Sequence, residues 1–260
     1  MILIIQTLKL TAQNINNSYS NNLKSLREND PNTIENNKKN FFKTSVTSPI
    51  SKSYTIEYER ILNKKLSLAF IFNGMPENNL PFNEFLKKKF GEDEFDRNAI
   101  ENFRLSSISF SPQLRFYLSK KGFGRGFYIA PFFNHSNFSI KKLPSIFTTT
   151  SNAVINIENS GKFTSNTGGI LFGAQWMLGK SLSLDWSIAG PHYGRGSGTL
   201  DGVAERDLKI EEQNELKDLW LNSSVSHLIK NVYVNEKGES LQLEGPWGGL
   251  KIGISIGFRF

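Results

Sequence analysis

The chain has 260 residues, with 31 Lys and Arg against 24 Asp and Glu, and a formal net charge of +7. Its hydrophobic fraction is 38%, and no stretch approaches the roughly 18 to 20 consecutive apolar residues that a membrane-spanning helix needs, so a helical membrane protein is excluded. The positive charge is spread along the chain without a basic stripe interleaved with aromatic residues, which argues against nucleic-acid binding.

The N-terminus is interpreted as an export segment followed by a leader. Residues 1–13 (MILIIQTLKLTAQ) combine an apolar stretch with a Thr-Ala-Gln sequence and predict a truncated or atypical signal peptide. The alternative is a frayed, partly apolar chain end. Residues 14–40 consist mainly of Asn, Ser, Lys and Glu, whose low apolar content cannot offset the entropy lost on ordering, so a flexible leader is expected. The folded domain is therefore predicted at 41–260.

From residue 41 onward, segments of strand length alternate apolar and polar residues. Strands are predicted at 41–48, 53–61, 65–73, 105–118, 126–140, 163–177, 181–190 and 248–260. Most connections alternate between short turns and long loops, the long ones being 74–104, 141–162 and 191–247, and this layout is typical of outer-membrane barrels. We expect an all-β fold: an eight-stranded antiparallel up-and-down transmembrane β-barrel with long extracellular loops. The even strand count places both termini on the periplasmic side of a bacterial outer membrane.

The alternation also predicts which side chains face the lumen. Apolar members of each strand would face lipid, and polar members would face inward. The charged inward residues hold both signs in equal number: Glu57, Glu59, Arg115, Asp185, Lys251 and Arg259. Eight strands leave an interior only wide enough for side chains, where charges must pair to offset desolvation. We therefore expect a filled lumen with a structural polar network, rather than an ion pathway or a catalytic carboxylate pair.

The long connection 191–247 has content of its own. Residues 201–221 are strongly charged, with leucines and a tryptophan at roughly helical spacing, and predict a surface helix. Its acidic residues could bind calcium or a partner, although a solvated face is the simpler interpretation. Residues 232–234 and 241–243 flank a turn and predict a hairpin. That hairpin would either cap the barrel on the outside or extend the wall to ten strands, and the cap is favoured.

The chain ends in a strictly alternating strand that stops on an aromatic residue. Phe258 and Phe260 are predicted to form the signal that the barrel-assembly machinery reads during insertion. Lysines at the membrane rims are expected to contact phosphates of outer-membrane lipid and lipopolysaccharide. These are the partners expected for the barrel wall.

Several segments resemble small outer-membrane barrels of Bacteroidota. They include 58–62 (YERIL), 110–118 (FSPQLRFYL), 173–178 (GAQWML) and 245–250 (GPWGGL). The resembling family is catalogued as a domain of unknown function, and the resemblance covers roughly residues 41–260. It implies a β-barrel fold and an outer-membrane address, and it supplies no catalytic residues.

No enzyme signature is recognised in the sequence. Metalloprotease, nucleophile-elbow and phosphate-loop patterns do not occur, and no cofactor or metal is expected. Lipid A deacylases are small barrels that use a His and a Ser two residues apart, on one face. Here His135 and Ser136 are adjacent, so alternation sends them to opposite faces. We therefore expect a structural or interaction protein that acts through its loops on an envelope or extracellular protein partner; a lipid A or phospholipid acyl hydrolase is the alternative, and a small channel ranks third.

Overall fold

The structure is a computed structural model that describes residues 38–80, 82–90, 94–120 and 122–260. The predicted signal peptide and residues 14–37 of the predicted leader lie outside the described residues. The strands are β1 (Asn40–Ser45), β2 (Tyr54–Ile61), β3 (Leu66–Asn78), β4 (Arg104–Tyr117), β5 (Gly126–Thr148), β6 (Val154–Leu178), β7 (Leu182–Ala204), β8 (Ile229–Asn235) and β9 (Gly238–Arg259). The helical elements are η1 (Ser48–Ser51), α3 (Asn83–Phe90), α4 (Glu94–Asn102), α5 (Ile210–Leu221) and η2 (Ser226–Leu228).

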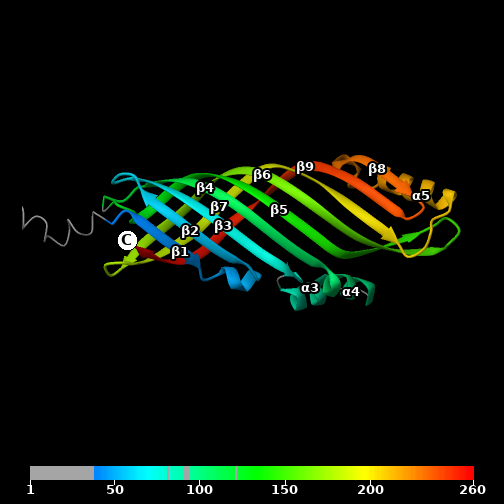
Figure 1. The fold of residues 1–260 in the computed structure, drawn as a ribbon, viewed down its shortest axis with the longest axis horizontal. Coiled ribbons are helices and arrows are strands. Elements are labelled where there is room, and N and C mark those ends of the chain that lie inside the picture. Colours follow the sequence, from blue (N-terminus) through cyan, green and yellow to red (C-terminus); the bar gives the residue numbers. More distant parts are fainter. Residues whose placement is uncertain (1–37, 81, 91–93, 121) are drawn as a thin grey trace, which may run out of the picture.

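The strands form one antiparallel sheet that closes on itself (Figure 1). The order is β1-β2-β3-β4-β5-β6-β7-β9, and β1 pairs with β9 to complete the ring. At the rim where the start of β1 meets the end of β9, Asn40 N donates to Phe260 O at 3.0 Å and Phe260 N donates to Asn40 O at 2.9 Å. We call this the near rim and the opposite end of the molecule the far end. The closed antiparallel sheet predicted from the sequence is confirmed, and the described residues supply eight strands to its wall.

The predicted hairpin forms, but it does not widen the barrel. β8 pairs with the first residues of β9, from the Asn235↔Gly238 pair at the turn to the Ile229↔Leu243 pair. The sheet order places β8 beyond β9 and outside the β1–β9 closure. The ten-strand alternative is therefore wrong, because β1 already occupies the edge of β9 nearer the rim.

Several strands are longer than predicted. β5, β6, β7 and β9 have 23, 25, 23 and 22 residues and run well past the ring toward the far end (Figure 1). Most of the predicted loop 141–162 is strand, and only 149–153 connects β5 to β6. The sequence hides this extension because its outward side chains, such as Asn156, Glu158 and Ser160, are exposed and polar. Likewise, the predicted loop 74–104 begins as strand and then contains α3 and α4.

The extended strands carry a hydrophobic core of their own at the far end. Phe147, Ile155 and Ile157 from β5 and β6 are buried against Leu208 and Leu216. Ala204, Trp220 and Val234 pack beside this cluster. We call this unit, made of α5, β8 and the far parts of β5, β6, β7 and β9, the outer lobe (Figure 1). The predicted helix over 201–221 begins only at Ile210, because 201–204 still belong to β7.

Helix α5 is anchored at its first turn by a carboxylate. Glu212 accepts a hydrogen bond from the backbone N of Lys209 at 2.8 Å, which satisfies a free amide at the helix start. The Arg206 guanidinium donates to both carboxylate oxygens of Glu212, each at 2.8 Å. These hydrogen bonds from Arg206, followed by the one from Lys209, lower the pKa of Glu212 from 4.5 to about 2.

Among the described residues, no helix is long and apolar enough to cross a membrane.

The core of the outer lobe yields a first prediction. Leu216 is 1% exposed, whereas Leu219 on the same helix is 50% exposed. Leu216→Ala should destabilise docking of α5 by roughly 2–5 kcal/mol, because it removes buried methyl groups and leaves a cavity. The matched Leu219→Ala change should cost less than about 0.5 kcal/mol. Protease cleavage within 205–228 as a function of urea measures the difference, and equal sensitivity of the two variants would contradict the packing.

The helix cap yields a second prediction, on pH. Because the pKa of Glu212 lies below its ordinary 4.5, its contribution to the stability of the α5 start is present above about pH 4.5 and is lost as pH falls toward about 2. Hydrogen exchange of the amides in the first turn of α5 should therefore quicken between pH 5 and pH 3, after correction for intrinsic rates. Glu212→Gln should remove this pH dependence, and Glu211→Gln should keep it. A pH dependence that survives in Glu212→Gln would assign the effect to another group.

Candidate functional site

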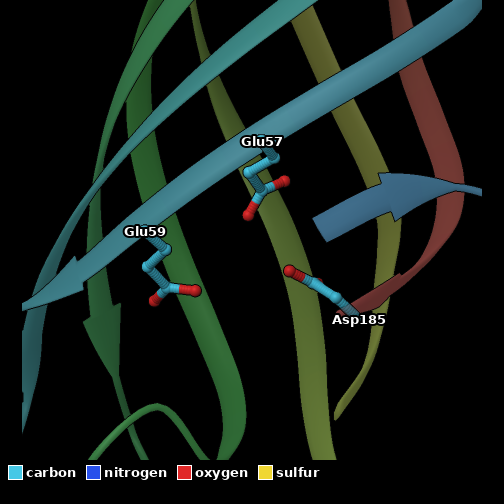
Figure 2. A group of neighbouring side chains, drawn as sticks. All are labelled: Glu57, Glu59 and Asp185. Atoms are coloured by element: carbon cyan, nitrogen blue, oxygen red, sulfur yellow. The ribbon is translucent and has the colours of Figure 1, made fainter. Parts of the chain in front are cut away.

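Five charged side chains meet inside the near half of the barrel. Figure 2 shows the carboxylates of Glu57 and Glu59 from β2 and of Asp185 from β7 turned toward one another. Lys43 Nζ lies 2.8 Å from Glu57, 2.6 Å from Glu59 and 2.5 Å from Asp185. Arg115 Nη1 lies 2.9 Å, 3.1 Å and 2.8 Å from the same three carboxylates. Each cation therefore bridges all three anions, and we call this group the ionic cluster.

Neutral side chains satisfy much of the remaining hydrogen-bonding capacity of the cluster. Tyr117 Oη donates to Glu59 at 2.7 Å, and Tyr128 Oη donates to Asp185 at 2.8 Å. Ser67 also donates to Glu59. Gln175 Oε1 accepts from Lys43 Nζ at 2.6 Å. Because these side chains are all buried, the cluster forms a solid polar plug across the lumen.

Strand pairing explains why these residues share one level. Lys43 lies opposite Glu57 on β1 and β2, and Gln175 lies opposite Asp185 on β6 and β7. Residues directly opposite in an antiparallel pair point to the same face, so each pair projects into the lumen together. A period of two along each strand then keeps the intervening apolar residues on the outside.

Four of the six lumen residues expected from the sequence come together, and two do not. Glu57, Glu59, Arg115 and Asp185 belong to the ionic cluster, whereas Lys251 and Arg259 lie apart from it. Asp185 is level with Ser255 of β9. Lys251 and Arg259 are each four residues from Ser255, or about 13 Å along the strand. The expectation that all six would pair is therefore wrong for these two, because they face inward at different heights.

Both outlying cations have partners other than carboxylates. Arg259 Nε donates to the backbone O of Lys38 at 2.8 Å, and its guanidinium carbon lies 5.4 Å from the centre of the Phe41 ring. Lys251 Nζ lies 3.2 Å from Ser111 Oγ and 5.2 Å from the centre of the Phe132 ring.

Sequence reasoning missed Lys43, the cation at the centre of the cluster. Its strand was predicted, but the faces of that strand were not assigned. The sequence offers no clear signal here, because Phe41 and Lys43 point inward while Phe42 and Thr44 point outward, so each face holds one Phe and one polar residue. The sequence analysis also did not identify Tyr117 and Tyr128 as hydrogen-bond donors to the carboxylates.

The three carboxylates could be taken for a metal site, since oxygen atoms of Glu57, Glu59 and Asp185 all lie within 4.8 Å of one another. Oxygen ligands of this kind suit a hard divalent cation. Here the positive charge among them is supplied by Lys43 and Arg115, at distances of 2.5 Å to 3.1 Å. The arrangement is therefore that of an ion-pair network.

A cavity of about 760 Å³ lies on the far side of the ionic cluster. Glu57 and Arg115 form part of its floor. Hydroxyl and amide side chains make up much of its wall, including Thr55, Asn73, Ser107, Ser109, Ser111, Gln113, Asn134 and Ser136. Phe132, Phe138 and Trp247 add aromatic surface. The expectation of a filled lumen thus holds for the near half of the barrel and is wrong for the half beyond the cluster. We call this space the hydroxyl-lined cavity.

The residues of the hydrolase alternative lie on opposite sides of the wall. His135 faces outward, where Nδ1 is 2.8 Å from Asn166 Oδ1 and Nε2 is 3.3 Å from Asn137 Nδ2. Ser136 faces the cavity, is 3% exposed and accepts a hydrogen bond from Asn134 Nδ2 at 2.7 Å. The Ser136 hydroxyl therefore has no access to the His135 ring as a base.

Comparison with known proteins gives little beyond these observations. No family model matches the chain, and no curated protein matches it. Among solved structures it is similar to CarO of Acinetobacter baumannii, with a TM-score of 0.34, 11% sequence identity, and coverage of 85% of this chain and 97% of that chain. So distant a likeness carries no statement about function. The resemblance to Bacteroidota barrels remains a prediction from sequence.

The ionic cluster yields a third prediction. Arg115→Met should lower the free energy of unfolding by roughly 3–5 kcal/mol, because it leaves three buried carboxylates with one cation. Arg195→Met is the matched control: that side chain is exposed, and its nearest carboxylate is 4.0 Å away. Urea unfolding of protein refolded into detergent micelles, followed by mobility of the folded form on gels, measures both variants. Equal changes in the free energy of unfolding of the two variants would show that the ionic cluster does not stabilise the fold.

Proposed function

We propose that this chain is an outer-membrane β-barrel protein of the interaction type, which is closed to passage and acts through its far end. The near rim, where β1 begins and β9 ends, would face the periplasm together with the tight turns. The outer lobe would face the outside of the cell envelope. This orientation follows the usual asymmetry of such barrels, whose longer connections lie on the extracellular side.

The observation that carries the proposal is an apolar band around the outside of the near half. On β6 the outward residues Ile170, Phe172, Trp176 and Leu178 are exposed and apolar, whereas farther along the strand Lys162 and other outward residues are polar. The same change occurs on neighbouring β5, where outward Phe127 and Phe133 give way to Asn137 and Lys141. It occurs again on β7, where Leu182 and Trp186 give way to Arg195 and Asp201.

The height of this band suits a bilayer. The segment 170–178 of β6 would extend about 30 Å at ~3.3 Å per residue, or about 23 Å along the barrel axis at a tilt of ~40°. Outer-membrane barrels show an outward apolar band of ~25 Å. So much contiguous apolar surface is rare on a soluble monomer, and the closed ring meets the requirement that backbone groups in hydrocarbon pair within the protein. Outer-membrane lipid and lipopolysaccharide would therefore surround the near half.

The interior supports an interaction role over passage or catalysis. The ionic cluster crosses the lumen with buried side chains, so it stands in the way of a continuous water path. The sequence offers no catalytic constellation, and His135 and Ser136 lie on opposite faces. The outer lobe instead presents a helix and a hairpin on a rigid stalk of paired strands, the kind of placement on which binding surfaces are built. An envelope or extracellular protein is the expected partner.

The membrane assignment yields a fourth prediction. Three of the four tryptophans serve as probes: Trp176 and Trp186 lie in the outward band, at 41% and 45% exposure, while Trp220 packs in the outer lobe. In single-tryptophan variants reconstituted into vesicles, brominated phospholipids should strongly quench Trp176 and Trp186 and leave Trp220 nearly unquenched. Similar quenching of all three would overturn the placement of the band in the bilayer.

The functional assignment yields a fifth prediction. Replacing 205–228, which contains α5, by a short Gly-Ser linker should leave the ring intact, because no ring pairing involves those residues. Chemical cross-linking in intact cells compares the two proteins: a product with a second protein should form with the wild type and be absent with the variant. Heat-modifiable gel mobility, which the variant should keep, shows that the variant still folds.

The hydrolase alternative is tested with the same preparations. Wild-type protein is incubated with lipopolysaccharide and with phospholipid, and the lipids are analysed by mass spectrometry. No release of acyl chains is expected. Release that disappears in His135→Ala would defeat the interaction proposal and favour an acyl hydrolase.

A further inference from the structure

The hydroxyl-lined cavity contains a cation that has no carboxylate partner. Lys251 lines the cavity from β9, and its Nζ donates a hydrogen bond to Ser111 Oγ at 3.2 Å. No carboxylate of the described residues lies within ion-pair distance of Lys251, since Glu57 in the cavity floor is bound by Lys43 and Arg115. A half-buried ammonium group held over the Phe132 ring, with no carboxylate beside it, favours an anionic partner.

A second donor points into the same space. Gln113 is 2% exposed, and its Oε1 accepts hydrogen bonds from Arg115 Nε and Nη2 at 3.2 Å and 3.1 Å. That pairing fixes the orientation of the amide and leaves Nε2 without a partner among the described residues. Gln113 and Ser111 are two residues apart on β4 and both point inward. Because Lys251 bonds Ser111, the free amide of Gln113 lies close to the level of Lys251. A buried donor of this kind costs free energy unless an acceptor reaches it.

The part of the wall formed by β4 and β5 suits a ligand rich in hydroxyl groups. Ser107 and Ser109 continue the inward serine row of β4, and Asn134 and Ser136 face it from β5. Hydroxyl and amide groups both donate and accept, so they match alcohol groups better than they match an apolar chain. Trp247 and Phe138 stand together at the cavity wall, with ring centres 5.3 Å apart, and offer an aromatic face against which a sugar ring could pack.

The cavity also reaches an unpaired part of the wall. On the β1 side, strand pairing of β9 stops at Ile254, whose O accepts from Val46 N at 2.9 Å, and begins again at Leu243 opposite Ile229 of β8. Residues from both sides of this interval line the cavity, Ser48 from η1 and Gly253 from β9 among them. The cavity lining therefore reaches the edge of β9 that carries no strand pairing among the described residues.

We propose that the hydroxyl-lined cavity binds a small hydroxylated carboxylate of the sugar-acid class. Lys251 and the Gln113 amide hold the carboxylate, the serine row binds the hydroxyl groups, and Trp247 packs on the ring. The ionic cluster forms the floor and keeps the ligand on the far side. This goes beyond a partner for the outer lobe, because the ligand sits within the barrel wall and needs neither α5 nor a membrane.

The test is titration calorimetry on the full folded chain in detergent micelles. The probes are D-glucuronate, D-glucose, which has the ring and hydroxyls without the carboxylate, and decanoate, which has the carboxylate without the hydroxyls. Glucuronate should bind at least tenfold more tightly than either of the others. Absence of glucuronate binding, or equal affinity for glucose, would overturn the proposal, and tighter binding of decanoate would assign the cavity to a single-chain lipid instead.

Variants locate the binding. Lys251→Gln should weaken glucuronate at least tenfold and leave glucose unchanged, whereas Trp247→Leu should weaken both sugars. Lys162→Gln, which removes an exposed cation on the outside of β6, is the matched control and should change nothing. Heat-modifiable gel mobility shows whether each variant folds. If Lys251→Gln does not fold, the ratio of the glucuronate and glucose affinities of the wild-type protein still tests the proposal. An unchanged glucuronate affinity in folded Lys251→Gln would refute the assigned role of Lys251.

Discussion

The narrow interior of an eight-stranded ring is the constraint on which the rest of this structure depends. Such a ring has room for side chains and little else, so any charge inside it loses most of its water. This chain places three carboxylates and two cations there, each cation bridging all three anions. Removing either cation would leave three buried carboxylates with a single positive charge, which makes Lys43 and Arg115 a strict condition on the fold.

The ionic cluster also specifies strand register. A slip of one residue between β1 and β2 would turn Lys43 outward and bring Phe42 inward, because successive side chains point to opposite faces. The same holds for Asp185 on β7. Apolar residues on the outside cannot fix the register so strictly, since one exposed Phe or Ile replaces another at little cost. The polar interior therefore provides specificity that the apolar surface lacks.

Beyond the ionic cluster, the side chains on both faces of the barrel wall change in kind. The outward side chains become polar while the inward ones become either hydroxylic or apolar, and the strands continue as a stalk that ends in the outer lobe. That lobe has its own buried cluster around Leu216, separate from the polar interior. Changes in the lobe therefore need not disturb the ring. In the proposed setting the near half holds the protein in the membrane, while the far half is free to serve binding.

The sequence by itself determined what is local. A period of two residues identified the strands of the ring, assigned the faces of several of them, and singled out Glu57, Glu59, Arg115 and Asp185 as inward charges, because alternation is a property of each strand alone. Only the tertiary structure decided which inward charges meet. That depends on the stagger between strands distant in sequence, which sets Lys43 beside Asp185 and leaves Lys251 about 13 Å away from that level. The long extension of β5, β6, β7 and β9 was hidden because polar residues on a paired strand resemble a loop until their partners are known. The hydroxyl-lined cavity was hidden because alternation tells which side chains face inward and not how much space they leave.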